Sequence, residues 1–593
     1  MSYTRTCIYG GDIKMNTFFG TLQHLFAMAD PVHMIWCIII LLTMLILAIL
    51  HHRWREDDRK IRLWRFLCLI PLLTAIIHYA IYAASPILAS GFIILYFIAI
   101  LALLPIPFAR RKIGYRITAI LTGVFSLVCG FCFCATSPHY HNFSRMSYTD
   151  SFHALVQEMD RTYVLKEWKE IDFARLEETY LPLVEEAEQE QNPAKFCDVV
   201  TMFCNELHDA HVFVMEQYDK EQHPSPYGQH EYGLAMVQLD NGDVVAVCTT
   251  DEVQKLGIKD GTVITHWNGK PILQAAEDVM DQGFPVKSNE NRIAVMQLSA
   301  VGGDTVDVTF SDQSGKETTV TLSDLGEQHS LREAVTALTQ VPPIETQKDI
   351  ETYLPKNLET KMLDDKCGYL VLNREMTDNI LLDYVSYMKG DHPWAREMFR
   401  EKLRELKALG MEYLVIDLRN NYGGKAEVGY ALVSLLTKDD QYGQGLGIRK
   451  DGAYTCVSDH IIHSDGEFAD LEVVALTNYN CVSAGDSTAM ALAALPHVTL
   501  AGITDSSGSN QETGGMCLLS DGALLVGFPT GLILDENGLP KVDTAADCIS
   551  RNPVEVRIPF DYDAAMQMFH EKEDYELAWA MGYLKYNADS HGN

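Results

Sequence analysis

Two stretches of sequence decide the fold: Asp417-Leu418-Arg419-Asn420-Asn421-Tyr422-Gly423-Gly424 and Cys481-Val482-Ser483-Ala484-Gly485-Asp486. An apolar run precedes each stretch, at 413–416 and at 473–476, and a segment of helical character follows it. This order predicts strand, turn and helix, twice, in an α/β layer. Reactive groups of open α/β sheets lie at the carboxyl ends of their strands. We therefore expect the two stretches to form one active site.

Ser483 allows two interpretations. The segment 483–486 has the spacing S-x-x-D of a helix-capping box, so the serine could simply cap the helix that follows. A serine hydroxyl at a helix N-terminus is also well placed as a nucleophile, because the helix dipole favours a developing oxyanion. The Gly423-Gly424 turn could offer N–H groups to that oxyanion, or it could only need positive φ.

Together the two stretches resemble the tail-specific, or C-terminal-processing, serine peptidases and their tricorn-like relatives. The resemblance runs from about Tyr148 to the C-terminus. It implies that Ser483 is the nucleophile and that amides of Gly423, Gly424 and Ala484 form the oxyanion hole. It also implies a crotonase-like ββα peptidase core over 363–560, of the α/β class.

The general base departs from the best-known branch of that family. Tail-specific proteases use a lysine at the place where this chain has Gly508, and no Lys or Arg occurs between Ser483 and Pro540. Composition alone therefore excludes that Ser–Lys arrangement. The tricorn-like branch pairs its serine with an early histidine, and His211 in the run 207–211 matches that location. Its ordinary pKa suits a general base near neutral pH, although His211 could instead cap the preceding helix.

An acid should hold the tautomer of the histidine. The tricorn-like resemblance implies a glutamate well beyond the serine, and Glu536 is the predicted residue. Asp543 falls in the same region and Glu512 lies closer in sequence, so both stay open as alternatives. His208 and His211 could bind a metal, but no third ligand is apparent, and no Cys or His spacing suggests zinc. We therefore expect neither a metal nor a cofactor.

Residues 232–322 resemble a PDZ domain. The pair Asn268-Gly269 between apolar runs predicts a tight hairpin. The run 232–235 matches the loop before the peptide-binding strand, so Gly233 and Leu234 are predicted to bind a peptide terminus. The alternative is a spacer with an inert groove.

Three further segments complete the predicted body. A helical cap and the first part of the peptidase domain occupy 148–230, where Phe152, Leu155, Val156 and Met159 have helical spacing. The segment 323–362 is predicted to be a linker, because it is acidic, contains Pro342-Pro343 and shows little periodicity. Residues 561–593 are predicted to form a C-terminal helix and tail.

The first 136 residues have a different character. Four apolar runs, at 34–50, 64–84, 87–109 and 117–135, approach the ~20 residues that cross a bilayer. Basic residues gather in the loops 51–65 and 110–116, which the positive-inside rule assigns to the cytoplasm. The prediction is a multi-pass cell-membrane protein with an extracytoplasmic peptidase body. The spans would anchor it in the lipid bilayer and could also join copies into a homo-oligomer.

Charge limits the class of partner. The 593-residue chain has 47 Lys and Arg against 80 Asp and Glu, a net charge of −33. Residues 1–136 hold 12 basic against 5 acidic residues, so the excess of acid lies entirely in the body. This excludes nucleic acid as a partner, because phosphate binding requires clustered cations. The 14 cysteines are scattered and do not indicate a disulfide framework.

These observations predict a membrane-anchored serine endopeptidase that hydrolyses protein or peptide substrates through an acyl-enzyme with a Ser–His centre. One alternative is a catalytically inactive homologue that binds peptides or signals. Another is a transport or sensing protein whose outer body only regulates it. The spans carry few ionisable residues, Asp30 and His78 being the main polar exceptions, which argues against a transporter.

Overall fold

The structure is a computed structural model. It describes residues 13–28, scattered positions between 39 and 70, and residues 139–591 except 218–229, 280–284, 313, 327–328, 342–355, 451 and 544–553. The predicted spans at 87–109 and 117–135, and most of those at 34–50 and 64–84, lie outside the described residues. In the part that is described, no helix has both the length and the apolar character needed to cross a membrane.

The core of the body is a sheet whose strands are parallel except for one edge strand. Alternate residues on its central strand face opposite sides, as a period of two requires. Leu414 and Ile416 belong to one apolar cluster, whereas Tyr413 and Val415 belong to another on the opposite face. In sheet order the strands are β18 (Val556–Arg557), β15 (Val498–Gly502), β14 (Glu472–Leu476), β11 (Tyr413–Asp417), β10 (Cys367–Leu372) and the antiparallel β9 (Leu358–Met362).

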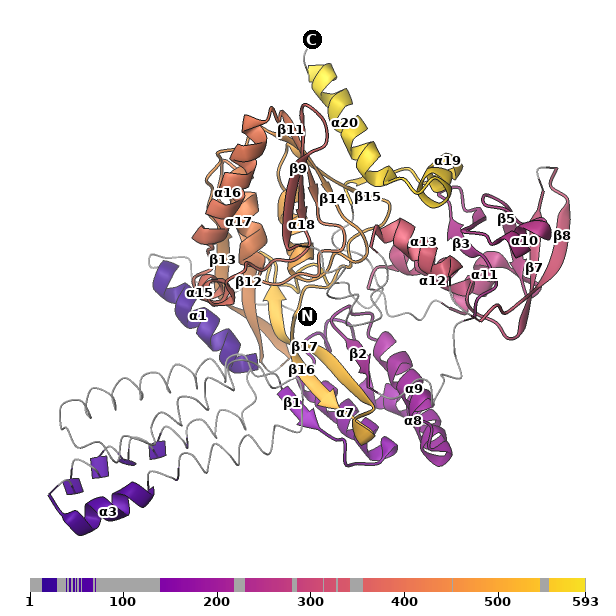
Figure 1. The fold of residues 1–593 in the computed structure, drawn as a ribbon. Coiled ribbons are helices and arrows are strands. Elements are labelled where there is room, and N and C mark those ends of the chain that lie inside the picture. The colour runs from indigo at the N-terminus through magenta and orange to yellow at the C-terminus, as the bar shows by residue number, and fades with distance from the viewer. Residues whose placement is uncertain are drawn as a thin grey trace.

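Helices cover both faces of this sheet (Figure 1). On the first face pack α16 (Pro393–Ala408), α17 (Ala426–Leu436) and α18 (Ala484–Ala493). On the second pack α13 (Ser330–Thr339) and the C-terminal helix α20 (Tyr575–His591), with the short α19 (Tyr562–Ala565) and the π-helical turn η4 (Met566–His570). Both motif turns follow neighbouring parallel strands, β11 and β14, so the sheet brings them together.

A second sheet combines strands from the beginning of the body with strands from its later part. Its apolar face packs on α7 (Tyr148–Thr162), α8 (Phe173–Glu190) and α9 (Pro193–Asn205). The predicted helical cap therefore shares one apolar cluster with strands from the catalytic half of the chain. In order the strands are β1 (His139–Asn142), β16 (Glu512–Leu518), β17 (Leu524–Leu534), β12 (Gln441–Lys450) and β13 (Ala453–Ile462), and β2 (Phe213–Glu216) pairs with β17.

A third, separate sheet occupies the segment that resembles a PDZ domain. Its strands are β3 (Ala235–Gln238), β4 (Val244–Val247), β5 (Val263–Trp267), β7 (Thr305–Ser311) and β8 (Glu317–Ser323), with β6 (Lys270–Pro271) beside β5. The helices α10 (Asp251–Lys255), α11 (Ile272–Glu277) and α12 (Lys287–Leu298) complete the unit. This unit projects to one side of the core sheet (Figure 1).

The predicted linker over 323–362 differs from the structure. Helix α13 and strand β9 both form within it. Helix α13 is amphipathic, and it buries Leu331, Ala334 and Leu338 in the cluster that also contains residues of β3 and of the core sheet. The segment is therefore part of the packed body. Its acidic sequence with little periodicity did not indicate the ten-residue helix α13.

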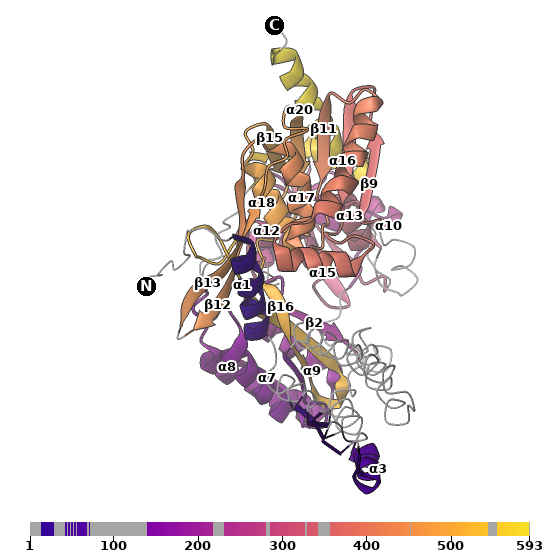
Figure 2. The same cartoon turned by 90° about the vertical axis from the view of Figure 1, so that its left-hand side faces the viewer.

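An N-terminal helix, α1 (Ile13–Met28), packs on the body beside α15 (Ile380–Lys389) and strands β12, β13 and β17 (Figure 2). Gly20 faces β13 so closely that a Cβ there would lie 2.0 Å from the carbonyl oxygen of Val457. His24, which is fully buried, contacts the Gly447 carbonyl at 2.6 Å and the Glu512 carboxylate at 3.3 Å. No sequence pattern indicated this contact between the two ends of the chain.

Candidate active site

Ser483 lies at the sharp turn between β14 and α18, with φ +64° and ψ −126°. Such a backbone conformation is costly for a non-glycine residue and persists only where its surroundings impose it. Its side chain does not cap α18. The Asp486 carboxylate accepts instead from the amides of Gly508 at 3.0 Å and Ser509 at 3.2 Å. The structure therefore does not form the capping box that the sequence allowed.

The glycine turn packs directly against this serine. A Cβ on Gly423, whose φ is +73°, would lie 2.5 Å from the Cβ of Ser483. A Cβ on Gly424, whose φ is +147°, would lie 2.3 Å from the Glu375 carbonyl oxygen. The Asn421 carbonyl accepts from the Val482 amide at 2.9 Å and ties the two turns together. Both glycines are thus required by close approach as well as by positive φ.

The three predicted oxyanion-hole amides differ in their hydrogen bonding. The Gly423 amide donates to the side-chain oxygen of Asn421 at 2.8 Å, so it is already engaged. Within the described part of the chain, the amides of Gly424 and Ala484 have no hydrogen-bond acceptor. Unengaged amides near a serine are what an oxyanion hole requires, and Gly424 directly follows the glycine that packs on Ser483.

His211 lies in the turn between α9 and β2. Its amide donates to Asp209 Oδ1 at 2.9 Å, and its Nδ1 is 4.0 Å from the same oxygen. This Nδ1 is buried and has no hydrogen-bond partner among the described residues. Burial lowers the pKa of His211, and the charges of Asp209 and Glu512 oppose that shift. The imidazole is therefore held neutral near pH 7, as a base must be.

A cavity of about 240 Å³ connects the segment of the histidine with that of the serine. Asp209, Ala210 and Val212 line it from one side, and Tyr422 and Val482 from the other. The rest of its wall is formed by Cys204, Asn205, Pro285, Tyr479, Asn480 and Ser507. The flanking residues of both predicted catalytic side chains thus enclose one hollow.

The candidate acids are placed very differently. Glu536 is exposed on the turn after β17, where it contacts only the neighbouring Asn537 at 3.5 Å. Glu512 accepts a hydrogen bond from the Tyr387 hydroxyl at 3.1 Å, and the Lys425 ammonium lies 3.9 Å away. Its third partner is His24 of α1, at 3.3 Å. Burial acts to raise the pKa of Glu512, but Lys425 and His24 outweigh it and bring the pKa to about 2.

Asp543 is connected to the segment of the histidine through Ser509, whereas Glu512 acts on His211 through its charge. Asp543 is fully buried, and its Oδ1 lies 3.2 Å from the hydroxyl of Ser509. The same hydroxyl donates to Asp209 Oδ1 at 2.6 Å. Asp209 itself is the carboxylate nearest to His211, and sequence reasoning did not single it out. Its position two residues before the histidine was the available signal.

Lys541 does not replace the absent lysine of the Ser–Lys branch. Its ammonium group is buried, donates to the Tyr430 hydroxyl at 2.8 Å and also contacts the Gly443 carbonyl. Burial lowers the pKa of Lys541 to about 7. Both contacts lie on β12 and α17, which leaves His211 as the candidate base.

The predicted peptide-binding loop is engaged inside the protein. The Gly233 amide donates to the Glu231 carboxylate at 2.6 Å, and the side chain of Leu234 is buried. The other oxygen of Glu231 accepts from the amides of His329 at 2.7 Å and Ser330 at 3.0 Å, at the start of α13. The predicted peptide-binding loop is therefore tied to the start of α13 through the Glu231 carboxylate.

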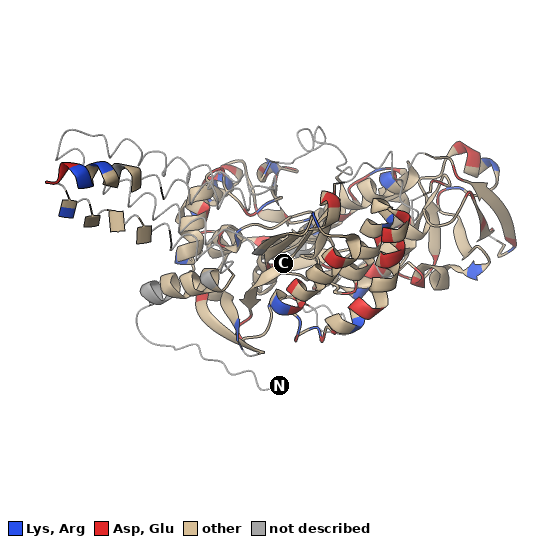
Figure 3. Cartoon of the chain, turned by 90° about the horizontal axis from the view of Figure 1, so that it is seen from below, with Lys and Arg blue, Asp and Glu red and all other residues tan. Residues whose placement is uncertain are grey.

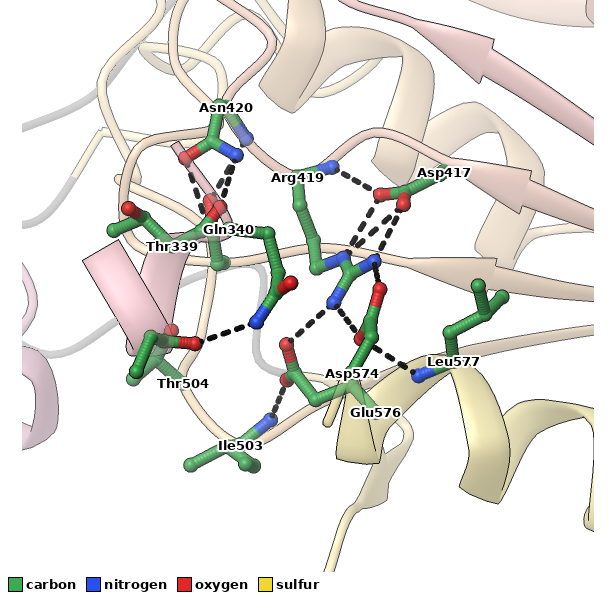
Figure 4. Close-up of polar contacts among 12 residues, drawn as sticks. Thr339, Gln340, Asp417, Arg419, Asn420, Ile503, Thr504, Asp574, Glu576 and Leu577 are labelled. Atoms are coloured by element: carbon green, nitrogen blue, oxygen red, sulfur yellow. Dashed lines mark hydrogen bonds and ion pairs between the residues drawn. The ribbon is translucent and has the colours of Figure 1, made fainter. Parts of the chain in front are cut away.

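Behind the glycine turn lies a buried charge cluster (Figure 4). The Arg419 guanidinium contacts Asp417 at 2.7 Å, Asp574 at 2.7 Å and Glu576 at 3.2 Å. The next residue, Asn420, donates to the Thr339 carbonyl at the end of α13 at 2.7 Å. The D-L-R-N-N segment thus joins the catalytic turn to α13 and to the C-terminal helix.

Comparison with known families gives one match. Residues 368–540 match the model of peptidase family S41. The matched segment includes both motif turns of the core sheet. It contains Gly423, Gly424 and Ser483, and the chain therefore carries the core of a serine peptidase, which is a hydrolase. The resemblance predicted from the two motifs is confirmed at this level.

Several solved structures are similar over most of the chain. Mature CPAF in complex with lactacystin is 14% identical with a TM-score of 0.48, covering 74% of this chain and 98% of that one. The photosystem II D1 C-terminal processing protease is 17% identical with a TM-score of 0.32, covering 72% and 98%. A peptidase from Parabacteroides merdae ATCC 43184, described as putative, is 15% identical with a TM-score of 0.38, covering 74% and 97%. No curated protein matches the chain.

Proposed function

We propose that the protein is a membrane-anchored serine peptidase with a Ser–His centre. The observation that carries the proposal is the strained Ser483 near the unengaged amides of Gly424 and Ala484. The Ser483 hydroxyl attacks the carbonyl carbon of the peptide bond, and its proton passes to His211. The two amides hold the resulting oxyanion. His211 then gives the proton to the leaving amine, and water hydrolyses the acyl-enzyme by the reverse sequence.

The orienting acid in this proposal is Asp209, with Asp543 behind it. Asp209 faces the Nδ1 of His211, which is the nitrogen that must keep its proton while the other nitrogen acts as base. At 4.0 Å the pair lies just beyond hydrogen-bond distance, and such contacts often tighten only when substrate is bound. Glu536, the predicted acid, is exposed, and its hydrogen bond is to the neighbouring Asn537 rather than to His211 or Asp209.

The cavity beside the centre supports a preference among peptides. Its wall combines the rings of Tyr422 and Tyr479 with Val212, Val482 and Pro285. Apolar surface of this kind stabilises an apolar side chain that leaves water. We therefore expect cleavage next to apolar residues of protein or peptide substrates.

A serine-directed fluorophosphonate tests the centre in the full-length protein. Labelling should be abolished by Ser483→Ala and slowed by about 100-fold or more by His211→Ala, because a general base contributes that much. Ser464→Ala and His463→Ala, which change exposed residues of one loop, should label like the wild type. Normal labelling of His211→Ala would reject the base. A folded wild type that is never labelled would instead identify an inactive, peptide-binding homologue.

The membrane anchorage has separate support. Large apolar side chains at described positions of the N-terminal region are exposed, including Ile46 at 53%, Ile49 at 57% and Phe66 at 73%. Such side chains suit lipid better than water. Lys and Arg gather on α3 (Asp58–Leu67), whereas Asp and Glu mark many helices of the body (Figure 3). That asymmetry suits a cytoplasmic α3 and an external body.

The docking of α1 adds a constraint on topology. Because α1 packs on the peptidase body, residues 28 and 139 must lie on the same side of any membrane between them. The number of crossings is then even, which agrees with four spans. A membrane-impermeant maleimide added to intact cells should modify Ser464→Cys at once and Arg59→Cys only after permeabilisation. The opposite labelling pattern would reject this orientation.

A further inference from the structure

One hydroxyl group touches two buried carboxylates beside the histidine. Ser509 Oγ lies 2.6 Å from Asp209 Oδ1 and 3.2 Å from Asp543 Oδ1, and all three side chains are buried. A serine hydroxyl has one proton, so it can donate to only one of the two carboxylates. The other carboxylate must then be a donor to the serine oxygen, or the contact is repulsive.

The remaining hydrogen bonds show which carboxylate is charged. Asp209 accepts from three donors: the Ser509 hydroxyl, the His211 amide at 2.9 Å and the Tyr163 hydroxyl at 2.8 Å. Three donors stabilise the ionised form of a carboxylate. The short 2.6 Å bond is also typical of a hydroxyl that donates to an anion.

Asp543 has the pattern of a neutral carboxylic acid. Its Oδ2 accepts from the Asn510 amide at 3.2 Å and from the Gln511 side chain at 2.7 Å, so this oxygen acts as a carbonyl. Its Oδ1 faces the Ser509 hydroxyl, whose own proton points to Asp209. A proton on Oδ1 of Asp543 satisfies every group in the chain of contacts.

We propose that Ser509 is a positioning residue for the catalytic histidine. The neutral Asp543 donates to Ser509, Ser509 donates to the ionised Asp209, and Asp209 faces the Nδ1 of His211. This inference rests on the proposed function, since it concerns how the general base is oriented. The Ser509 carbonyl also accepts from the Ser483 amide at 2.9 Å, so one residue contacts both the nucleophile and the acid.

The charges around Asp543 support its neutral form. Burial is the main cause that raises the pKa of Asp543 to about 7, the charge of Asp209 adds to it, and Lys169 opposes it. Lys169 is directed to the His208 carbonyl at 2.9 Å. Asp486, which holds the Ser509 amide, lies on the α18 side, and burial raises its pKa to about 7 as well. Tyr163 faces Asp209 from α7 as a neutral donor.

The same substitution at the two carboxylates should have opposite effects. In Asp543→Asn, the amide nitrogen can donate to Ser509 and the amide oxygen can accept from Asn510 and Gln511, so at pH 6.5 this variant should be labelled at least about tenfold faster than Asp209→Asn. Asp209→Asn removes the charge that faces His211 and should slow labelling by about 100-fold or more. Ser509→Ala keeps the carbonyl contact to Ser483, breaks the proton chain and should slow labelling by about tenfold or more.

The pH profile gives a readout that a merely structural role would not change. As the pH rises through about 7, Asp543 loses its proton and competes with Asp209 for the single proton of Ser509. The wild-type labelling rate should therefore fall on the alkaline side. Asp543→Asn cannot ionise and should keep its rate there. Asp543→Asn as slow as Asp209→Asn, or an unchanged alkaline fall, would overturn the proposal.

An infrared measurement separates this inference from the proposed function. A protonated buried carboxylic acid gives a carbonyl band distinct from that of carboxylates. The full-length wild type should show this band at pH 6, Asp543→Asn should lose intensity in it, and the exposed-residue control Asp312→Asn should not. If the wild type is never labelled, the proposed function fails, and the band still decides where the proton lies. An unaltered band in Asp543→Asn would overturn the neutral Asp543.

Discussion

Ser483 is held in a conformation that costs about 1–3 kcal/mol, and its neighbours supply the compensation. Its amide donates to the Ser509 carbonyl, and the amide of Val482 donates to Asn421. Each bond comes from a different loop, at 504–511 and at 418–424. The position of the nucleophile therefore depends on both loops at once, and small changes in either should affect reactivity before they affect folding.

Gly423→Ala should remove the activity of an otherwise folded protein. The added Cβ would lie 2.5 Å from the Cβ of Ser483, and alanine disfavours the φ of +73°. We expect fluorophosphonate labelling to fall by about 100-fold or more, and the thermal midpoint to fall further than in a glycine turn without such contacts. Gly452→Ala is the matched control, because it has a φ of +74° and no described atom within 4 Å of the added Cβ. Normal labelling of Gly423→Ala would show that the turn is not part of the site.

The sequence singles out the proposed nucleophile and oxyanion-hole residues more readily than the residues of the proposed acid network. Ser483, Gly424 and Ala484 could be located because one strand–turn–helix pattern contains each of them. The acid could not be located in this way, because its place is set by three segments that meet only in the fold. Asp209, Ser509 and Asp543 are far apart in sequence, and an acidic chain offers many equivalent candidates. Glu536 was chosen on its distance along the chain, which carries no information on burial.

Among the helices and strands, too, those encoded by a local pattern were predictable, and those that depend on distant contacts were not. The core strands were predictable because their apolar runs are continuous, as expected for strands buried on both faces. Helix α13 was not, because it is short and only three of its apolar side chains are fully buried. Its partner surface, on β3 and α12, is distant in sequence. The start of α13 contacts Glu231, just before the loop that the resemblance assigned to peptide binding.

Gly20→Leu should release α1 from the body. Any side chain at this position would collide with the Val457 carbonyl, whose closest approach to an added Cβ is 2.0 Å. We expect hydrogen exchange of residues 13–28 to accelerate by about tenfold or more. Gly582→Leu, in α20, is the control because no described atom lies within 4 Å of its added Cβ. Unchanged exchange in Gly20→Leu would mean that α1 is not held by this contact.

At the scale of the whole molecule, the C-terminal helix is bound to the catalytic turn by charge. Arg419 is buried and holds Asp417 of β11 together with Asp574 and Glu576 at the start of α20. Ile503, at the end of β15, donates its amide to Glu576 at 2.8 Å. Strand β11 is therefore linked to the start of α20 through Arg419, and the end of β15 is linked to it through Glu576.

Arg419→Met should destabilise the protein most near neutral pH. It leaves the buried Asp417 and Glu576 and the half-buried Asp574 without their cation, at a cost of about 3–5 kcal/mol. Burial alone would raise the pKa of Asp574, but Arg419 outweighs it and lowers that pKa. The wild-type stabilisation is therefore present above the ordinary pKa of a carboxyl and is lost as the pH falls, whereas protonation relieves the variant. The difference between the two thermal midpoints should shrink from pH 7 to pH 4.

Arg404→Met provides the comparison for that measurement. Its guanidinium pairs with Glu467 at 2.6 Å, but 58% of its side chain is exposed. Exposed pairs of this kind contribute little to stability, because solvent screens them. We expect little change in its thermal midpoint at either pH. A similar loss in both variants would show that burial of Arg419 is not what matters.

The docked α1 bears on how any shortened version of this enzyme should be produced. A shortened protein that starts at residue 139 would expose the slot on β12 and β13 and leave Glu512 without His24. Such a product would risk aggregation through the uncovered surface and would misreport the native activity. Joining residue 28 to residue 139 with a flexible Gly/Ser linker would restore the contacts of α1 with β12 and β13. Adding residues 13–28 as a separate peptide should have the same effect.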